Sequence, residues 1–245
     1  MITLRRASER QHDQRNKHEV WRTFSWRSRA EQLADGFGSL EFLDEHRLSP
    51  RARVSRKAAG EAETVTYVRD GTIAYHDSTG RSGVIHAGEF QCTTIRRGEQ
   101  STETNASRTD SAHFFRASLV PPHAGLEPNQ EQRRFGLADR RGGLCVVASP
   151  DARKNSLRIQ QDALIYSALF DSGQHVAYEL SQGRSVWLHL LQGEVALGDI
   201  ALTSGDGAGL QAERSVSFTA IERTELLLID VGDLRLTDKI GATRA

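Results

Sequence analysis

Short stretches in which apolar and polar residues alternate recur along most of the chain, and they predict β-strands. The clearest is Glu-Thr-Val-Thr-Tyr-Val at 63–68, which is rich in β-branched and aromatic residues. The other strand-like segments lie at 72–75, 114–120, 164–170, 185–190, 215–218 and 225–230. Helix is expected only as single turns, at 30–33 and 131–137. The pattern therefore predicts an all-β protein.

A turn pattern that occurs twice divides these strands into two groups. In the first copy Gly71 follows a strand and Gly88-Glu89 follows a hairpin, and in the second copy Gly193 and Gly205-Asp206 take the same places. Glycine favours turns that need φ > 0, and the acid can accept hydrogen bonds from nearby backbone amides. We therefore expect a bicupin, with two tandem cupin-type β-barrels.

The polar segment at 136–143, which ends in Arg-Arg-Gly-Gly, is the expected domain junction. We place the N-terminal barrel at 1–140 and the C-terminal barrel at 141–245. Trp187 is expected to be largely buried in the second barrel, because its two neighbours in the strand cover the opposite face.

The charge and hydropathy of the sequence argue against nucleic acids and membranes as binding partners. The 245 residues carry 32 Lys plus Arg and 32 Asp plus Glu, so no net charge attracts nucleic acid or an anionic membrane. No apolar run approaches the roughly 20 residues of a membrane span, and the polar segment 1–29 lacks the apolar centre of a secretory signal. We expect a cytoplasmic monomer or weak dimer whose partner is an unknown small molecule or protein, with no nucleic acid and no membrane.

Motifs for several common chemistries are absent from the sequence. There is no Gly-x-Ser-x-Gly elbow and no phosphate-binding glycine loop, and no two histidines have His-x-His or His-x3-His spacing. The basic stretches at 51–57 and 133–141 are expected to be solvated loops. No residue is assigned a catalytic role.

Several longer motifs occur in a shared order that resembles the pirin family of bicupins across nearly the whole chain. The matching segments are 23–26 (Thr-Phe-Ser-Trp), 36–40 (Gly-Phe-Gly-Ser-Leu), 43–45 (Leu-Asp-Glu), 63–68, 77–80 (Asp-Ser-Thr-Gly), 88–91 (Gly-Glu-Phe-Gln), 127–132 and 156–208. The resemblance implies iron or another transition metal in the first barrel and, where that site is intact, quercetin 2,3-dioxygenase activity.

The positions that the resemblance assigns to metal ligands are mostly occupied by other residue types. Pirins hold the metal with a His-Pro-His run before the Glu-Thr-Val-Thr-Tyr motif and a His-x-Glu pair after the next glycine turn, a set that suits non-haem iron. Here these positions are Lys57, Ala59, Ser101 and Glu103. Because Glu103 is the one good ligand among them, we expect a pocket at these positions without a metal or other cofactor.

A charge contact is the expected substitute for the metal. If Lys57 and Glu103 converge, the ammonium group balances the retained carboxylate, and the hydroxyl of Ser101 assists. This hypothesis depends on the register of the segment 51–61, which contains no anchoring motif.

Two further positions differ from the family pattern. Pirins carry Gln-x-Trp where this chain has Arg116 and Ser118, which strand alternation puts on one face. Either this face lines the pocket, which then gains a cation, or Arg116 points into solvent. Cys92 is a candidate for redox sensitivity, because Arg96 and Arg97 lie nearby and positive charge lowers a thiol pKa.

Two functions from different classes remain. The first is a pirin-like bicupin without a functional iron site, acting as a non-enzymatic binding, regulatory or stress-response protein. The alternative is a metal-dependent dioxygenase of the quercetin 2,3-dioxygenase type, whose chemistry needs a metal to bind the flavonol oxygens.

Overall fold

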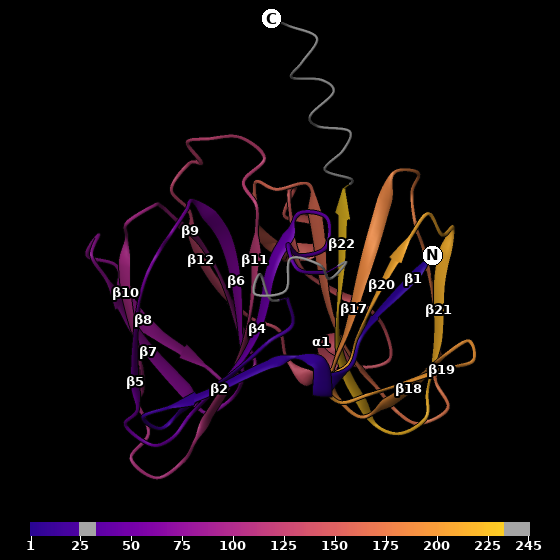
Figure 1. Ribbon diagram of the computed structural model, residues 1–245, viewed down its shortest axis with the longest axis horizontal. Helices are drawn as coiled ribbons and strands as arrows, with labels where there is room; N and C mark the ends of the chain where they lie inside the picture. The colour runs from indigo at the N-terminus through magenta and orange to yellow at the C-terminus, as the bar shows by residue number, and fades with distance from the viewer. Residues whose placement is uncertain (25–32, 233–245) are drawn as a thin grey trace, which may run out of the picture.

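The computed structural model describes residues 1–24 and 33–232. Nearly all of the regular structure in these residues is β-strand, as predicted, and Figure 1 shows it gathered into two lobes. No helix in the described part of the chain is long and apolar enough to cross a membrane. The helical turn predicted at 30–33 falls, apart from Leu33, outside the described residues.

Each lobe consists of a seven-stranded sheet and a four-stranded sheet that do not close into a barrel, an arrangement like a jelly roll. In the first lobe the large sheet has the order β12-β9-β6-β11-β4-β3-β2 and the small sheet the order β5-β10-β7-β8. The strands are β2 (Gln11–Arg15), β3 (His18–Arg22), β4 (Leu40–Leu48), β5 (Arg53–Lys57), β6 (Ala62–Asp70), β7 (Thr72–Asp77), β8 (Ser82–His86), β9 (Glu89–Ile95), β10 (Gln100–Asn105), β11 (Ala112–Leu119) and β12 (Gln130–Arg134).

The second lobe repeats this plan with the orders β1-β20-β17-β22-β15-β13-β14 and β16-β21-β18-β19. Its strands are β1 (Ile2–Arg5), β13 (Cys145–Ser149), β14 (Leu157–Arg158), β15 (Ala163–Phe170), β16 (His175–Glu179), β17 (Arg184–Gln192), β18 (Glu194–Leu197), β19 (Ile200–Thr203), β20 (Gly207–Gln211), β21 (Ser215–Ala220) and β22 (Thr224–Gly232). Two 3-10 turns, Ala7–Glu9 and Arg153–Asn155, and the single-turn helix α1 (Leu137–Arg140) complete the described elements.

The first strand crosses the predicted domain boundary. β1 pairs antiparallel with β20, so Ile2–Arg5 belongs to the sheet of the second lobe and not to the first barrel. The structure thus places the first strand of the range assigned to the N-terminal barrel in the second lobe, and the boundary at 140 stays a prediction. Backbone hydrogen bonds with a distant strand decide this placement, and nothing in the local sequence of residues 2–5 indicates which edge they join.

The two large sheets pack against each other through a shared core (Figure 1). Trp187 is completely buried, as predicted, but it lies in this shared core, 4.9 Å from Phe24 and 5.4 Å from Phe37 between ring centroids. Its neighbours Val186 and Leu188 lie in the separate core inside the second lobe. β17 is thus buried on both faces, and the predicted location of Trp187 inside the second barrel was wrong.

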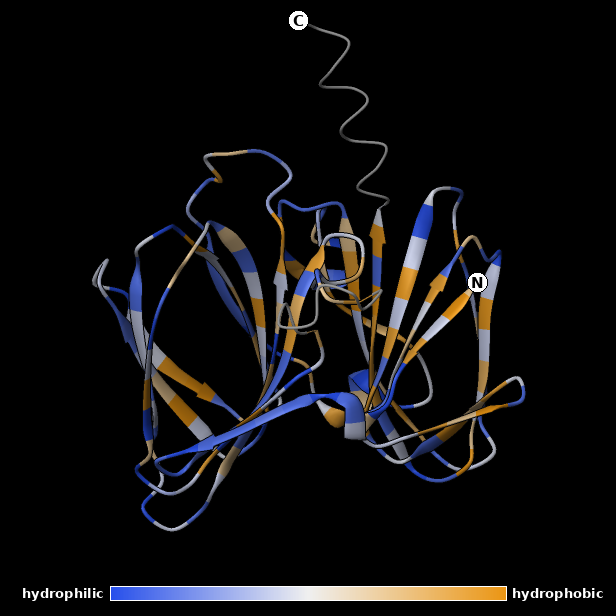
Figure 2. Ribbon diagram, viewed as in Figure 1, coloured by the Kyte–Doolittle hydropathy of each residue, from blue (hydrophilic) through white to orange (hydrophobic). Residues whose placement is uncertain are grey.

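The interiors of the two lobes differ in polarity. The core inside the second lobe runs along most of its strands, and Figure 2 shows the apolar positions on β17, β20 and β22. The first lobe has a smaller apolar cluster, which includes Leu48, Ile73 and Phe114. Many polar and charged side chains line the remaining interior of the first lobe, and two cavities lie there.

The predicted junction contains a buried arginine. Arg140, in α1, is 3% exposed and donates hydrogen bonds to Glu225 (3.0 Å), Tyr67 (2.8 Å) and Ser167 (3.2 Å). It joins β6 of the first lobe to β15 and β22 of the second. The expectation that 133–141 forms only a solvated loop was therefore wrong.

Candidate functional site

A cavity of about 310 Å³ between the two sheets of the first lobe contains all four positions assigned to the metal site. Lys57, Ala59, Ser101 and Glu103 line it, together with Ser118. Its remaining wall mixes polar side chains with apolar ones, including Phe42, Ile85 and Ile95, and comes mainly from β6, β7, β9 and the segment 58–61. We name it the upper cavity. Its volume is within the range of pockets that hold small organic molecules.

The pairing of β5 with β10 decides which basic residue faces Glu103. Arg56 lies opposite Ser101, and Val54 lies opposite Glu103, so these four residues share one face of the sheet. Lys57 lies opposite Gln100 on the other face and is exposed. The predicted contact between Lys57 and Glu103 was therefore wrong, because the segment enters the sheet with Arg56 inward.

Arg56 is a site residue that the sequence did not indicate. Its Nε donates a hydrogen bond of 3.0 Å to Ser101 Oγ, and it makes no ion pair among residues 1–24 and 33–232. Burial, together with the nearby charge of Arg116, lowers its pKa to about 10. The expectation of a solvated loop at 51–57 was wrong here as well. Val54, two residues before Arg56, is the one apolar signal that indicates the inward face of this strand.

Glu103 is already paired with a different cation. The guanidinium of Arg116 donates to Glu103 Oε1, and the side chains of the two residues are 7% and 11% exposed. Arg116 also donates to Thr66 Oγ1 at 3.4 Å, and its guanidinium carbon lies 5.4 Å from the ring centroid of Phe114. Of the two alternatives for this residue, the interior position is the one found.

The donors that surround the upper cavity do not fit the metal site of the family. Ala59 has no donor atom, Ser101 Oγ accepts a hydrogen bond from Arg56, and Glu103 is held by Arg116. The buried guanidinium group of Arg116 and the half-buried one of Arg56 oppose the approach of another cation. Within residues 1–24 and 33–232, no group of three or more His, Cys, Asp or Glu side chains is placed to hold a metal ion.

Cys92 is poorly placed for a redox sensor. It is fully buried in β9, and burial, reinforced by Glu63 and Glu131, raises the pKa of its thiol well above the usual value. The expected influence of Arg96 and Arg97 is thus outweighed, and these surroundings do not favour the thiolate form. Cys145 is partly exposed, and burial raises its pKa too.

We expect both thiols to resist alkylation in the native protein, with Cys145 reacting first. Iodoacetamide labelling followed by peptide mass spectrometry measures the two rates. Cys92→Ser is expected to leave the native labelling rate unchanged, and Cys145→Ser to abolish most of it. Rapid native labelling at Cys92 would contradict its described burial.

Comparisons with known proteins agree with this fold. The family model for pirin matches residues 5–117, and the model for the quercetinase C-terminal cupin domain matches residues 146–231. A quercetin 2,3-dioxygenase of Escherichia coli (strain K12) is 30% identical over 231 residues, which is 94% of this chain and 99% of that protein. A pirin-like protein of Caulobacter vibrioides is 29% identical over 210 residues, covering 84% of this chain and 89% of its own length.

Solved structures give the same result. YhhW from Escherichia coli superposes with a TM-score of 0.83 at 29% identity, covering 96% of this chain and 99% of its own. The bacterial pirin YhhW in complex with nickel(II) has a TM-score of 0.85 at 29% identity, covering 96% and 100%.

Proposed function

We propose that this chain, which belongs to the pirin family, binds a small organic molecule in its first cupin domain and has exchanged metal chemistry for an arginine–carboxylate pair. The proposed role is that of a non-enzymatic binding, regulatory or stress-response protein. It acts as a monomer or weak dimer in the cytoplasm, without nucleic acid or membrane.

The observation that carries this proposal is the buried contact between Arg116 and Glu103. A metal ion at Glu103 would have to displace the guanidinium, which would then be left buried without its partner. Removing one partner from a buried ion pair costs about 3–5 kcal/mol. The other three family positions carry no histidine, so no strong metal–ligand bond at these positions offsets this cost.

The relatives favour a second function. The relative from Escherichia coli (strain K12) carries the name quercetin 2,3-dioxygenase, and the structure of the bacterial pirin YhhW is a complex with nickel(II). If this chain has that activity, a metal must bind at Glu103 and supply Lewis-acid chemistry to the flavonol.

Metal analysis and oxygen uptake separate the two functions. The purified protein, supplied with iron(II) or nickel(II) and then dialysed, is expected to retain no stoichiometric metal and to consume no oxygen with quercetin. The YhhW protein of Escherichia coli, treated in the same way, is the reference for a metal-binding pirin. Stoichiometric metal together with oxygen uptake by this chain would establish the dioxygenase function instead.

A rebuilt site tests the role of the ion pair directly. The double change Ala59→His and Ser101→His places histidines at two family positions that line the upper cavity, and adding Arg116→Gln frees Glu103. We expect the triple variant to bind nickel(II) at least about tenfold more tightly than the double variant, because one charge repulsion and one competing hydrogen bond are removed. Equal affinities by titration calorimetry would show that the ion pair does not exclude the metal.

A further inference from the structure

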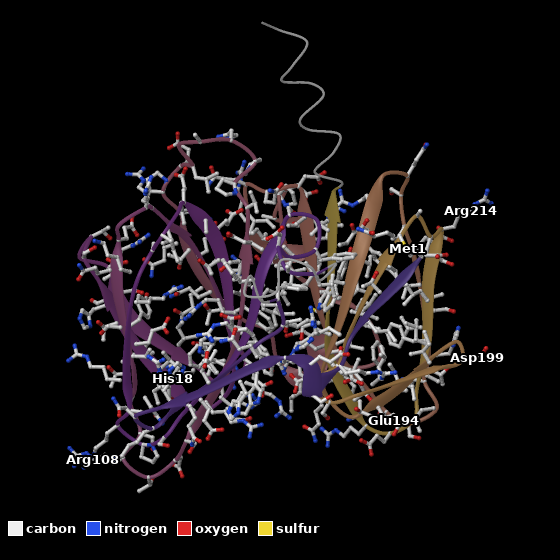
Figure 3. The ribbon with its side chains drawn as sticks, viewed as in Figure 1. Met1, His18, Arg108, Glu194, Asp199 and Arg214 are labelled. Carbon is white, nitrogen blue, oxygen red and sulfur yellow. The ribbon has the colours of Figure 1, made fainter. Side chains whose placement is uncertain are left out.

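A second and larger cavity, of about 680 Å³, lies at the side of the first lobe. It is lined by β3 and β4 from the large sheet and by the edge strand β5 from the small sheet. β5 is hydrogen-bonded within its sheet to β10 alone, so the two sheets remain apart along its other edge. We name this cavity the side chamber. Figure 3 labels His18, one of the residues that line it.

The side chamber contains buried polar atoms without a partner in the described part of the chain. Asp44 Oδ1 is one, and His46 Nε2 is another. The ring of His46 is fixed, because its Nδ1 lies 3.0 Å from His18 Nε2 and its plane stacks on Phe114 at 4.7 Å between centroids. Buried polar atoms in native proteins nearly always have a partner, so these atoms indicate a bound molecule or water.

The charges that line the side chamber favour an anion. Five arginines face three acidic residues there: Arg15, Arg22, Arg53, Arg56 and Arg116 against Asp13, Asp44 and Glu103. Two of these arginines are already neutralised, since Arg22 is paired with Asp13 and Arg116 with Glu103. Arg56 makes no ion pair with an acid that the structure describes, and the nearby charges of Glu103 and Asp44 offset its own only from a greater distance.

Arg56 lies between the two cavities. It lines both the upper cavity and the side chamber, and so do Phe42, Glu103 and Ser118. A planar guanidinium presents parallel N–H donors that match a carboxylate, whereas a lysine would offer a point charge. Arg56 has used only its Nε, on Ser101.

We propose that the side chamber binds a small hydroxycarboxylate, whose carboxylate pairs with Arg56 and whose hydroxyl donates a hydrogen bond to Asp44 Oδ1. His46 Nε2 supplies a second polar contact. The carboxylate balances the unpaired guanidinium, and the hydroxyl satisfies the buried carboxylate oxygen. This site uses none of the family's metal-ligand positions except Glu103 in the shared wall, so it extends beyond the proposed function.

Small probes of defined chemistry test the match. Lactate and malate carry both groups, propionate carries the carboxylate alone, and glycerol carries hydroxyls alone. At pH 7.5 and constant ionic strength, titration calorimetry is expected to show lactate or malate binding at least about tenfold more tightly than propionate, with no binding of glycerol. Equal affinity for propionate and lactate would remove Asp44 from the proposal, and no binding of any carboxylate would overturn it.

Matched variants locate the site. Arg56→Gln is expected to reduce lactate affinity at least about tenfold, and Asp44→Asn to reduce it to that of propionate. Lys57→Gln and Arg108→Gln each remove the same charge and are expected to change nothing. Lys57 lies at the rim of the upper cavity, and Arg108 lies on an exposed loop and lines neither cavity (Figure 3). If Lys57→Gln weakens binding as much as Arg56→Gln does, the anion sits in the upper cavity and the proposal is wrong.

A measurement on the unaltered chain keeps the test independent of variant folding. In 15N-histidine spectra, the ring signals of His18 and His46 should shift on addition of lactate, and those of the exposed His12 and His175 should not. Unmoved signals at saturating lactate would overturn the proposal. Absence of lactate binding would not change the result of the metal analysis, and retention of metal would not change the lactate result. The side-chamber proposal and the proposed function can therefore fail independently.

Discussion

Replacing Arg116 by alanine is expected to lower the free energy of unfolding by about 3–5 kcal/mol, as measured by urea denaturation at pH 7. The change leaves Glu103 buried at 8% exposure without its ionic partner. It also removes the contact of the guanidinium with the ring of Phe114. Both losses act in the folded state, so the midpoint should fall while the slope of the transition is retained.

Two variants separate the ion pair from simple loss of packing. The double change Glu103→Leu with Arg116→Met removes both charges, and it is expected to recover most of the lost stability because no unpaired charge remains. Lys57→Ala is expected to change stability by less than about 0.5 kcal/mol, since Lys57 is exposed. A large effect of Lys57→Ala with a small effect of Arg116→Ala would restore the contact first expected from the sequence.

The fold could be predicted from the sequence because the patterns that indicate its strands and turns are local. The alternation at 63–68 lies within β6, and the segment 185–190 lies within β17. The four positions that the resemblance assigns to the metal site all line one cavity. Strand alternation and turn glycines depend on neighbours in the chain, so no distant contact is needed to recognise them.

Local sequence patterns could not show whether Arg56 or Lys57 faces the interior of the first lobe, and the reason is physical. A shift of one residue moves every side chain of a strand to the other face, and normally the hydrophobic pattern prevents it. The segment Arg-Ala-Arg-Val-Ser-Arg-Lys at 51–57 has basic residues on both faces and one valine. One valine is a weak signal, and the pairing of β5 with β10 identifies the inward face.

The shared core was also invisible in the sequence. β17 and β22 are buried on both faces, so they read as continuous apolar runs without the alternation of a strand at the surface. An apolar run indicates burial but not whether the covering layer is the same lobe or the other one. The location of Trp187 was wrong for this reason, although its burial was predicted.

The same shared core is the basis of the second large prediction, a loss of stability in acid. His189 is fully buried in β17, and neither of its ring nitrogens has a partner among the described residues. Burial, assisted by the charge of Arg10, lowers its pKa from 6.5 to about 3. In this pH range the His189 imidazole is protonated in the unfolded chain and neutral in the folded one. The free energy of unfolding therefore falls as the pH falls from about 6.5 towards 3.

Titratable groups in the first lobe also change how stability depends on pH, some increasing and some decreasing it in acid. Burial raises the pKa of Asp44 to about 6, so its contribution to stability grows as the pH falls from about 6 to 3.8. Burial lowers the pKa of His46 well below its usual value, which adds to the loss below pH 6.5. Burial alone would raise the pKa of Glu45, but hydrogen bonds from His113 and Arg10 lower it to about 2, so its contribution is lost between about pH 4.5 and 2.

Replacing His189 by leucine isolates the largest of these contributions. Between pH 7 and pH 4 the variant is expected to lose about 3 kcal/mol less stability than the unaltered protein, from a shift of about 1.4 kcal/mol per pKa unit. Asp44→Asn should act in the opposite direction and make the profile steeper, by about 2 kcal/mol over the same interval. Chemical denaturation at a series of pH values measures both. If the profile of the leucine variant runs parallel to that of the unaltered protein, the acid lability resides elsewhere, because a histidine that is buried and neutral in the folded state must produce a difference between the two.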